Sequence, residues 1–292
     1  MKRRARRAAL LLTTLAVATI GAVLSAGPSG AGATDPPPYY LAVGGSGSVG
    51  FQPTLSNPHG HPTGSGYADD LAGRLASRWP GLTLVRVGCP GATTETMIAG
   101  GGHCAYPAGS QLETALAFFH THPSTALVTV DLGFNDVVPC LRHMEVDEDC
   151  VSTALATISS QLPQILTALR QAAPAGTRFL GLGHYDPFVA DELRGPIGDT
   201  FADASVGVIE RLDEVLRAAY AHVGIPMADI SGAFDLPDTN PVDVPGLGVV
   251  PTNVARVCSL TWMCAAQPLG PNTHPNDDGY RVESNALAAA LS

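Results

Sequence analysis

Short apolar runs alternate along the chain with longer segments whose apolar residues recur every three or four positions. Apolar runs of about four to eight residues are typical of buried strands, and the wider spacing is typical of helices with one buried face. The runs are residues 39–43, 82–87, 126–132, 179–182 and 225–230, and the helical segments are 67–79, 151–173, 206–220 and 278–291. Strands that alternate with helices form a parallel sheet covered on both faces. The pattern predicts an α/β fold, a three-layer α/β/α sandwich with a central parallel sheet of about five strands.

Two stretches, residues 184–199 and 234–251, interrupt this alternation. Long irregular segments in compact domains are often binding loops, and plain surface connectors are an equal alternative here. In open parallel sheets, ligands bind outside the carboxyl ends of the strands. Candidate functional residues are therefore expected just after the apolar runs.

The N-terminus has the pattern of an export signal. Five cations lie within residues 2–7, and residues 8–26 are apolar apart from a few Thr and Ser. This pattern predicts a signal peptide over residues 1–33, cleaved after Ala26 or Ala33, and a single domain over residues 34–292. A retained anchor and export by the twin-arginine route remain open, since the run is just long enough to span a membrane. In either case we expect the mature chain outside the cytoplasm.

The mature region is strongly acidic. It holds eleven arginines and no lysine against 26 Asp and Glu, a net charge near −15. Such a surface repels phosphate backbones and anionic lipid headgroups, so we expect no nucleic-acid partner and no electrostatic membrane docking. Without lysine the mature chain cannot form a Schiff base, a Walker-type phosphate loop or a Ser-Lys dyad.

The six cysteines allow fifteen pairings, but they fall along the chain into three pairs of cysteines close in sequence. This clustering favours the disulfides Cys89–Cys104, Cys140–Cys150 and Cys258–Cys264. Free core thiols are the alternative, which an exported chain makes less favourable. The spacing is not that of a zinc site.

Two pairs of histidines two residues apart invite a metal interpretation. They are His59 with His61 and His120 with His122, and neither pair is accompanied by a cluster of Cys or carboxylates. Solvated histidines explain them better. We therefore expect neither a metal nor a cofactor.

The glycine-rich stretch 44–50 follows the first predicted strand and fits two incompatible functions. As G-x-G-x-x-G it would cradle a dinucleotide, which requires a helix to begin within the glycines and an acid to end the next strand. Pro53 and Pro58 prevent an immediate long helix, and the next strand ends in Val87-Gly88-Cys89. The alternative is that the turn presents Ser46 as a nucleophile.

A serine nucleophile needs a base and donors for an oxyanion. His274 precedes the last helical segment, Asn135 follows the third strand, and Gly91 follows the second. Each candidate therefore lies near the end of a separate element, where one sheet edge would bring it to Ser46.

The four short motifs that contain Ser46, Gly91, Asn135 and His274 occur in the order and at the spacing of a known family. The chain thus resembles the SGNH (GDSL-type) hydrolases, and in particular secreted actinobacterial esterases and lipases. The segments 88–94 and 274–280 carry much of the resemblance, which covers nearly the whole mature region. It implies a flavodoxin-like SGNH hydrolase fold, Ser46 as nucleophile, His274 as base, and an oxyanion hole formed by Ser46, Gly91 and Asn135. It also implies that Ser48 is a neighbour in the turn. For residues 184–188 two interpretations are open, a lining of the acyl pocket and a packed turn.

Two positions depart from the family. Gly45 replaces the aspartate before the serine, and Pro271 replaces the acid three residues before the histidine. Some family members are described as using a main-chain carbonyl there, so we expect a Ser46-His274 dyad with the Pro271 carbonyl orienting the imidazole. An acid folding back from Asp277 or Asp278 is the alternative.

The resemblance thus implies a secreted, metal-independent carboxylic ester hydrolase, an esterase or lipase that forms an acyl-enzyme on a small-molecule or lipid ester. A monomer without a membrane span after processing is expected. Acyl transfer, action on carbohydrate esters, or a binding protein with impaired catalysis are the alternatives.

Overall fold

The computed structural model describes residues 36–291, so the expected signal peptide lies outside the described residues. A parallel five-stranded sheet runs through this region in the order β4-β1-β5-β8-β9. Its strands are β1 (Tyr39–Gly44), β4 (Thr83–Arg86), β5 (Thr125–Asp131), β8 (Arg178–Leu182) and β9 (Met227–Ala228). The predicted three-layer α/β/α fold is confirmed.

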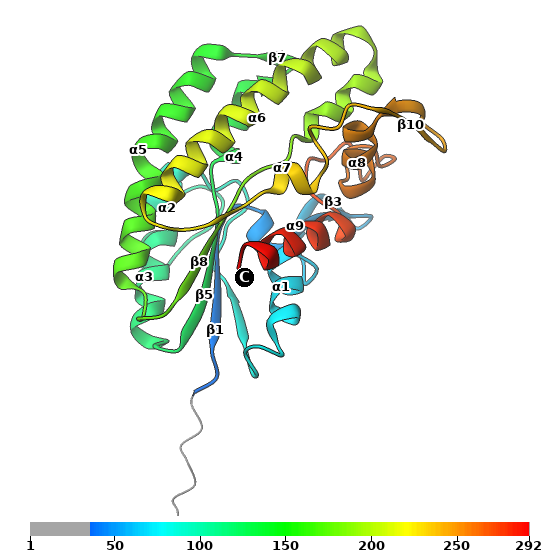
Figure 1. Cartoon of the computed structure of the whole chain (residues 1–292). Coiled ribbons are helices and arrows are strands. Elements are labelled where there is room, and N and C mark those ends of the chain that lie inside the picture. The colour runs from blue at the N-terminus through cyan, green and yellow to red at the C-terminus, as the bar shows by residue number, and fades with distance from the viewer. Residues whose placement is uncertain (1–35, 292) are drawn as a thin grey trace, which may run out of the picture. The chain divides into compact units, whose positions relative to one another are not determined.

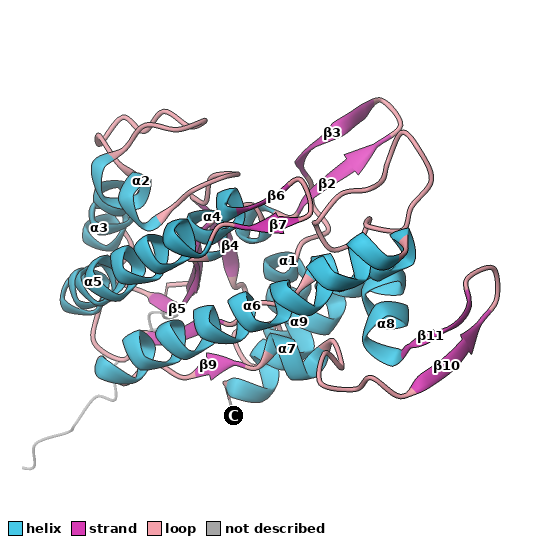
Figure 2. Ribbon diagram, turned by 90° about the horizontal axis from the view of Figure 1, so that it is seen from above, coloured by secondary structure: helices cyan, strands magenta, loops and turns pink. Residues whose placement is uncertain are grey.

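Helices cover both faces of the sheet, and the connections carry short helices and hairpins (Figures 1 and 2). The helices are α1 (Tyr67–Leu75), α2 (Thr94–Ala99), α3 (Gln111–Thr121), α4 (Phe134–Val137), α5 (Glu148–Ala172), α6 (Pro196–His222), α7 (Ile230–Ala233), α8 (Thr252–Leu260) and α9 (Asp277–Ala290). Short 3₁₀ turns are η1 (Gly47–Val49), η2 (Val138–Cys140) and η3 (Pro187–Arg194). Two-stranded hairpins pair β2 (Phe51–Thr54) with β3 (Asn57–Pro62), β6 (Leu141–Arg142) with β7 (Glu145–Val146), and β10 (Pro241–Val244) with β11 (Gly248–Pro251).

Alternation along the strands divides the core into two layers. Leu41 and Val43 of β1 pack with α3, α5 and α6, whereas Tyr40 and Ala42 pack with α1 and α9. Successive side chains of a strand point to opposite faces, so a strand buried on both sides is apolar throughout. This is why the central strands read as continuous apolar runs. Figure 1 shows α3 and α5 on one side of the sheet and α1 and α9 on the other.

The interrupting segments contain more structure than their sequence indicated. Residues 187–194 form η3, and α6 begins at Pro196 rather than near residue 206. Proline suits the first turn of a helix because its missing N–H would be unpaired there anyway. The strand expected over residues 225–230 is shorter in the structure, where β9 covers only two residues. It ends there because Asp229 caps α7 by accepting the N–H of Gly232.

Three disulfides join Cys89 to Cys104, Cys140 to Cys150 and Cys258 to Cys264, the same pairs that the spacing favours. Each closes a loop of 6 to 15 residues. No helix within residues 36–291 is long and apolar enough to cross a bilayer.

Candidate active site

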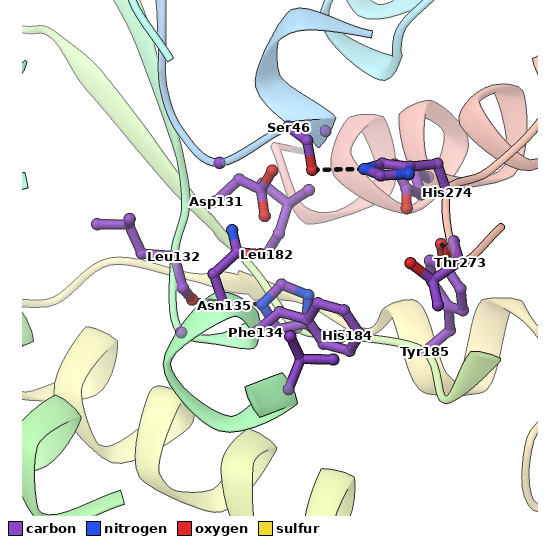
Figure 3. A pocket seen from close by; sticks show the side chains of 16 residues that line it. Ser46, Asp131, Leu132, Phe134, Asn135, Leu182, His184, Tyr185, Thr273 and His274 are labelled. Carbon is purple, nitrogen blue, oxygen red and sulfur yellow. Dashed lines mark hydrogen bonds between the residues drawn. The ribbon is translucent and has the colours of Figure 1, made fainter. Parts of the chain in front are cut away.

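A cavity of about 110 Å³ opens at the carboxyl edge of the sheet, lined by the segments that follow β1, β5 and β8 and by the segment before α9 (Figure 3). The strand order reverses between β1 and β5, because the chain passes from β1 to β4 on one side and then to β5 on the other. Such a switch point is where open α/β sheets bind ligands. Ser46, Asn135 and His274 all line this cavity.

The loop that carries Ser46 is held from two sides. Gly44 has φ +124°, and a Cβ there would lie 1.9 Å from the carbonyl oxygen of Asp131, so glycine is required. The next residue, Gly45, donates its N–H to that same oxygen at 2.7 Å. From α3, the Gln111 side chain accepts the Gly44 N–H at 2.6 Å and donates to the Gly44 carbonyl at 3.1 Å. These contacts fix the backbone from which Ser46 projects.

The two serines of this loop point in different directions. Ser48 is fully buried, and its hydroxyl donates to the Gly45 carbonyl at 2.6 Å. Ser46 instead faces the cavity, with Oγ 2.9 Å from Nε2 of His274 (Figure 3). Only Ser46 has the geometry of a nucleophile beside a base.

The other imidazole nitrogen of His274 bonds to a side chain that sequence reasoning missed. Nδ1 lies 2.7 Å from Oδ1 of Asn272, and the same oxygen accepts the backbone N–H of His274 at 3.0 Å. A backbone N–H can only donate, which identifies the amide atom as the oxygen and not the nitrogen. Nδ1 must therefore carry the hydrogen, and Nε2 is left to accept the Ser46 proton.

The predicted orienting group, the Pro271 carbonyl, is thus replaced by its neighbour in the chain. Asn272 forms a turn in which its side chain accepts the N–H two residues on, a conformation that asparagine favours. That turn places Oδ1 directly beside the imidazole. The available signal was an asparagine two residues before the histidine. The alternative acids point elsewhere, since Asp277 accepts from Gln52 and Asp278 pairs with Arg281.

The His274 segment is attached to the end of α8. Trp262 donates its N–H to the His274 carbonyl at 3.0 Å, and Asn276 donates its N–H to the Leu260 carbonyl at 2.9 Å. The disulfide Cys258–Cys264 closes the loop that contains both partners. Asn276 also caps α9 by accepting the N–H groups of Asp278 and Gly279. His274 is therefore positioned by backbone contacts on both of its sides.

Burial lowers the pKa of His274 to about 4. Taking the imidazole out of water disfavours its charged form, and the Phe51 ring packs 4.7 Å from it between centroids. Since the Asn272 amide is neutral, it adds no charge that would raise the pKa again. The imidazole of His274 is thus neutral at physiological pH.

Asn135 follows β5 and brings its amide to the Ser46 loop. Nδ2 donates to the Ala92 carbonyl at 3.1 Å, which leaves one amide hydrogen. A Cβ on Gly45 would lie 3.0 Å from this nitrogen, so glycine at 45 leaves the amide room. The geometry suits a donor for an oxyanion formed at Ser46.

Gly91 lies in the adjoining segment and lines a neighbouring hollow with His103 instead of the Ser46 cavity. Its segment is tied to the block after β5 by two contacts. Asn135 bonds to the Ala92 carbonyl, and Asp136 accepts both the N–H and the hydroxyl of Thr94. The structure therefore brings Ser46, Asn135 and His274 into one cavity and places Gly91 next to it.

Two carboxyl groups in the cavity were not among the predicted site residues. Asp131 ends β5, and its Oδ2 accepts the Ser48 N–H at 3.1 Å. A Cβ at Gly47 would lie 2.6 Å from that oxygen, so the carboxylate lies directly against the loop in which Gly45 replaces the family's usual aspartate. The second carboxyl is Glu283 of α9. An acidic residue at the end of an apolar run was the only signal for Asp131.

The turn after β8 contributes His184 and Tyr185 to the cavity wall, as Figure 3 shows. His184 donates its backbone N–H to the Asp213 carboxylate at 2.9 Å, and its ring packs against Phe134 in a tilted arrangement. Tyr185 donates its hydroxyl to the Thr273 carbonyl, beside the base. Part of the aromatic turn 184–188 thus borders the site.

The paired histidines are not part of a larger cluster of ligand residues in the described region. Among residues 36–291, no group of three or more His, Cys, Asp or Glu is arranged to hold an ion. His122 stacks on Phe118 with ring centroids 3.9 Å apart, and His59 lies on the β2–β3 hairpin.

A family model described as the GDSL-like lipase/acylhydrolase family matches residues 42–282. Among solved structures, the extracellular lipase of Streptomyces rimosus is similar, with TM-score 0.56, 19% identity, and coverage of 87% of this chain and 99% of that chain. Phospholipase A1 of Streptomyces albidoflavus NA297 has TM-score 0.54, 20% identity, and coverage of 87% and 100%. An acetylxylan esterase of Geobacillus stearothermophilus has TM-score 0.53, 14% identity, and coverage of 87% and 94%.

At these identities the solved structures establish a shared fold and no more, and a comparison with curated protein sequences found no match. The family match is more informative, because it extends over most of the described chain and takes in Ser46, Asn135 and His274. The chain therefore belongs to the GDSL-like lipase/acylhydrolase family, whose members are carboxylic ester hydrolases.

Proposed function

We propose that the protein is a secreted serine esterase that works through an acyl-enzyme on Ser46, with His274 as general base and Asn272 as the residue that orients it. The observation that carries this proposal is the chain of hydrogen bonds from Ser46 Oγ through the imidazole to Asn272 Oδ1. Nucleophile, base and orienting group thus stand in the order that activates a hydroxyl.

In the proposed cycle, Nε2 of His274 takes the Ser46 proton as Oγ attacks the ester carbonyl. The oxyanion is held by the Asn135 amide and by the N–H groups of Ser46 and Gly91, neither of which donates to another group within residues 36–291. His274 then returns the proton to the departing alcohol. Water, activated by the same histidine, releases the acid and restores Ser46.

A neutral orienting group suffices because it selects the correct tautomer. In the serine protease triad, changing the aspartate to asparagine costs about 10⁴ in rate, mainly because the imidazole then takes the wrong tautomer. Here the Asn272 oxygen is turned toward the imidazole by the His274 backbone N–H. What the site lacks is only the negative charge that would stabilise the imidazolium.

Export is part of the proposal. The three disulfides are typical of oxidising compartments, and residues 1–33 have the composition of a signal peptide. We propose a monomeric extracellular enzyme that takes a small-molecule or lipid ester.

The test is hydrolysis of p-nitrophenyl esters of increasing chain length, together with labelling by a fluorophosphonate probe. Wild type should hydrolyse esters and become labelled at Ser46, because the probe reacts with activated serines. Ser46→Ala should lose both properties, whereas Ser48→Ala, which removes the other hydroxyl of the loop, should keep the label. Full esterase activity in Ser46→Ala, or an unlabelled native wild type, would overturn the proposal.

A further inference from the structure

The cavity beside Ser46 contains a carboxyl group that the proposed cycle does not use. Glu283 is only 6% exposed and lines the cavity, and its side chain makes no hydrogen bond to another residue within 36–291. Buried polar side chains almost always have a partner. The carboxyl of Glu283 is therefore free to bind a polar group that enters the cavity.

Three buried tyrosines lie near enough to Glu283 for their charges to interact, and the hydroxyls of two of them bond elsewhere. Tyr185 donates to the Thr273 carbonyl, and Tyr280 donates to the Phe51 carbonyl at 2.8 Å. A tyrosine hydroxyl has a single hydrogen. Neither residue can therefore donate to Glu283 while it keeps its present bond. The third, Tyr67, has a buried hydroxyl without a hydrogen-bond partner in the described chain, so it does not bond to Glu283 either.

Asp131 shares the cavity and adds a second group that accepts hydrogen bonds. Its Oδ2 accepts one N–H from Ser48, and its Oδ1 has no donor within the described chain. Neither Arg nor Lys is found among the residues that line the cavity; His184 and His274 are its only basic members. The cavity thus presents carboxyl oxygens without the cations that would normally neutralise them.

Burial, and secondarily the charge of Asp131, raises the pKa of Glu283 well above its ordinary value. Burial also raises the pKa of Asp131, although His184 and the Ser48 N–H oppose the shift. Glu283 therefore takes up a proton more readily than an exposed glutamate, and in its protonated form it can donate one hydrogen bond as well as accept others.

The size of the cavity restricts what can fill it. At about 110 Å³ it is smaller than the cavity of roughly 150 Å³ that admits benzene in an engineered protein. The acyl group stays on Ser46 after the alcohol has left, so a small cavity beside Ser46 suits the acyl part of the ester. Its volume matches a short acyl group.

We propose that this cavity selects a short acyl group whose far end carries a hydrogen-bond donor, a hydroxyl or an ammonium group, which Glu283 and Asp131 bind. The proposal rests on the proposed esterase function and names its substrate class. Glu283 and Asp131 would then be specificity-determining residues, with no part in the transfer of the proton.

Three esters of equal size test the proposal: the phenyl esters of butyric, 3-hydroxypropionic and 3-aminopropionic acid. Their acyl groups differ only in a terminal methyl, hydroxyl or ammonium. We expect wild-type kcat/KM to favour at least one polar ester over the butyrate by about 10- to 100-fold, because the butyrate leaves buried carboxyls without partners. The hydroxyl and ammonium esters distinguish the two possible donors.

Two variants at one position assign the preference to Glu283. Glu283→Leu should reverse it by raising kcat/KM for the butyrate and lowering it for the polar ester. Glu283→Gln, which nearly preserves shape and keeps both a donor and an acceptor, should retain part of the preference for the hydroxyl ester and lose it for the ammonium ester. Asp278→Asn is the matched control, since it removes an exposed carboxylate from the same helix.

The outcomes separate this proposal from the function on which it rests. If the butyrate is hydrolysed as well as or better than both polar esters, the esterase function stands and the polar pocket is refuted. The same holds if a preference for polar esters survives unchanged in Glu283→Leu. If none of the three esters is hydrolysed and Ser46 takes no fluorophosphonate label, the esterase function and the pocket proposal fall together.

Discussion

The substitution Asn272→Asp tests the most specific feature of the site, the neutral group that orients His274. It exchanges one amide nitrogen for an oxygen and adds a negative charge on the group whose Oδ1 lies 2.7 Å from Nδ1. The geometry is otherwise preserved, because the His274 backbone N–H can still donate to Oδ1. The change therefore isolates the effect of charge.

The expected shift in the pKa of His274 follows from the short distance between its Nδ1 and Oδ1 of residue 272. Opposite charges about 4 Å apart attract by about 4 kcal/mol at an effective dielectric of 20, and a carboxylate this close shifts a pKa by about 1 to 3 pH units. A negative charge favours the imidazolium, so the pKa of His274 must rise. Burial places it at about 4 in the wild type, and the variant should titrate between about 5 and 7.

The assay is the pH dependence of kcat/KM for a soluble ester from pH 4 to pH 9. Activity needs the neutral imidazole, so wild type should keep its activity down to about pH 5, whereas Asn272→Asp should lose it one or more pH units higher. On the plateau the variant should be at least as fast as wild type, because a charge near the imidazolium stabilises the transition state.

Two control variants make the result decisive. Gln267→Glu adds the same charge at an exposed position of the same loop, where solvent and salt screen it, and should leave the profile unchanged. Asn272→Ala removes the hydrogen bond and should lower the plateau. An acid limb that does not move in Asn272→Asp would refute the role assigned to Asn272, and so would wild-type turnover in Asn272→Ala.

Two further predictions concern the oxyanion and the stability of the fold. Asn135→Ala should lower kcat by about 10² to 10³ with little change in KM, the usual cost of removing one oxyanion donor, and an unchanged kcat would exclude that role. Asp186 is buried and accepts from Ser205 and Phe188, and burial raises its pKa to about 7. Because the pKa of Asp186 is higher in the folded state than in the unfolded chain, the folded state binds the proton more tightly. The stabilisation of the fold that results is fully present below about pH 4 and is lost as the pH rises through about 7. Asp186→Asn, an isostere of the protonated acid, should remove that loss, on the order of 2 to 4 kcal/mol. Melting temperatures at pH 5 and pH 8 should therefore converge in the variant, and a wild-type pH dependence in Asp186→Asn would contradict this assignment.

The central sheet could be predicted because its strands are buried on both faces. Burial makes β1, β5 and β8 continuous apolar runs, which are visible without any knowledge of their neighbours. The β2–β3 hairpin was missed because its residues are polar, His- and Pro-rich, and only half-buried. The early start of α6 was missed because residues 196–205 show no clear apolar periodicity, although Gly195-Pro196 is a typical helix start.

What the sequence determined by itself was local: the glycine turn that exposes Ser46, the histidine before the last helix, the three short-range cysteine pairs, and the family to which these motifs belong. What orients His274 depended on one side chain folding back over two residues, which pattern alone does not distinguish from a backbone carbonyl. The cavity depended on more distant contacts, because Asp131 and Glu283 lie about 150 positions apart and meet only when α9 packs on the sheet. Motifs recur in sequence because chemistry constrains them locally, whereas the residues that shape a pocket are brought together by packing, and only the tertiary structure contains that information.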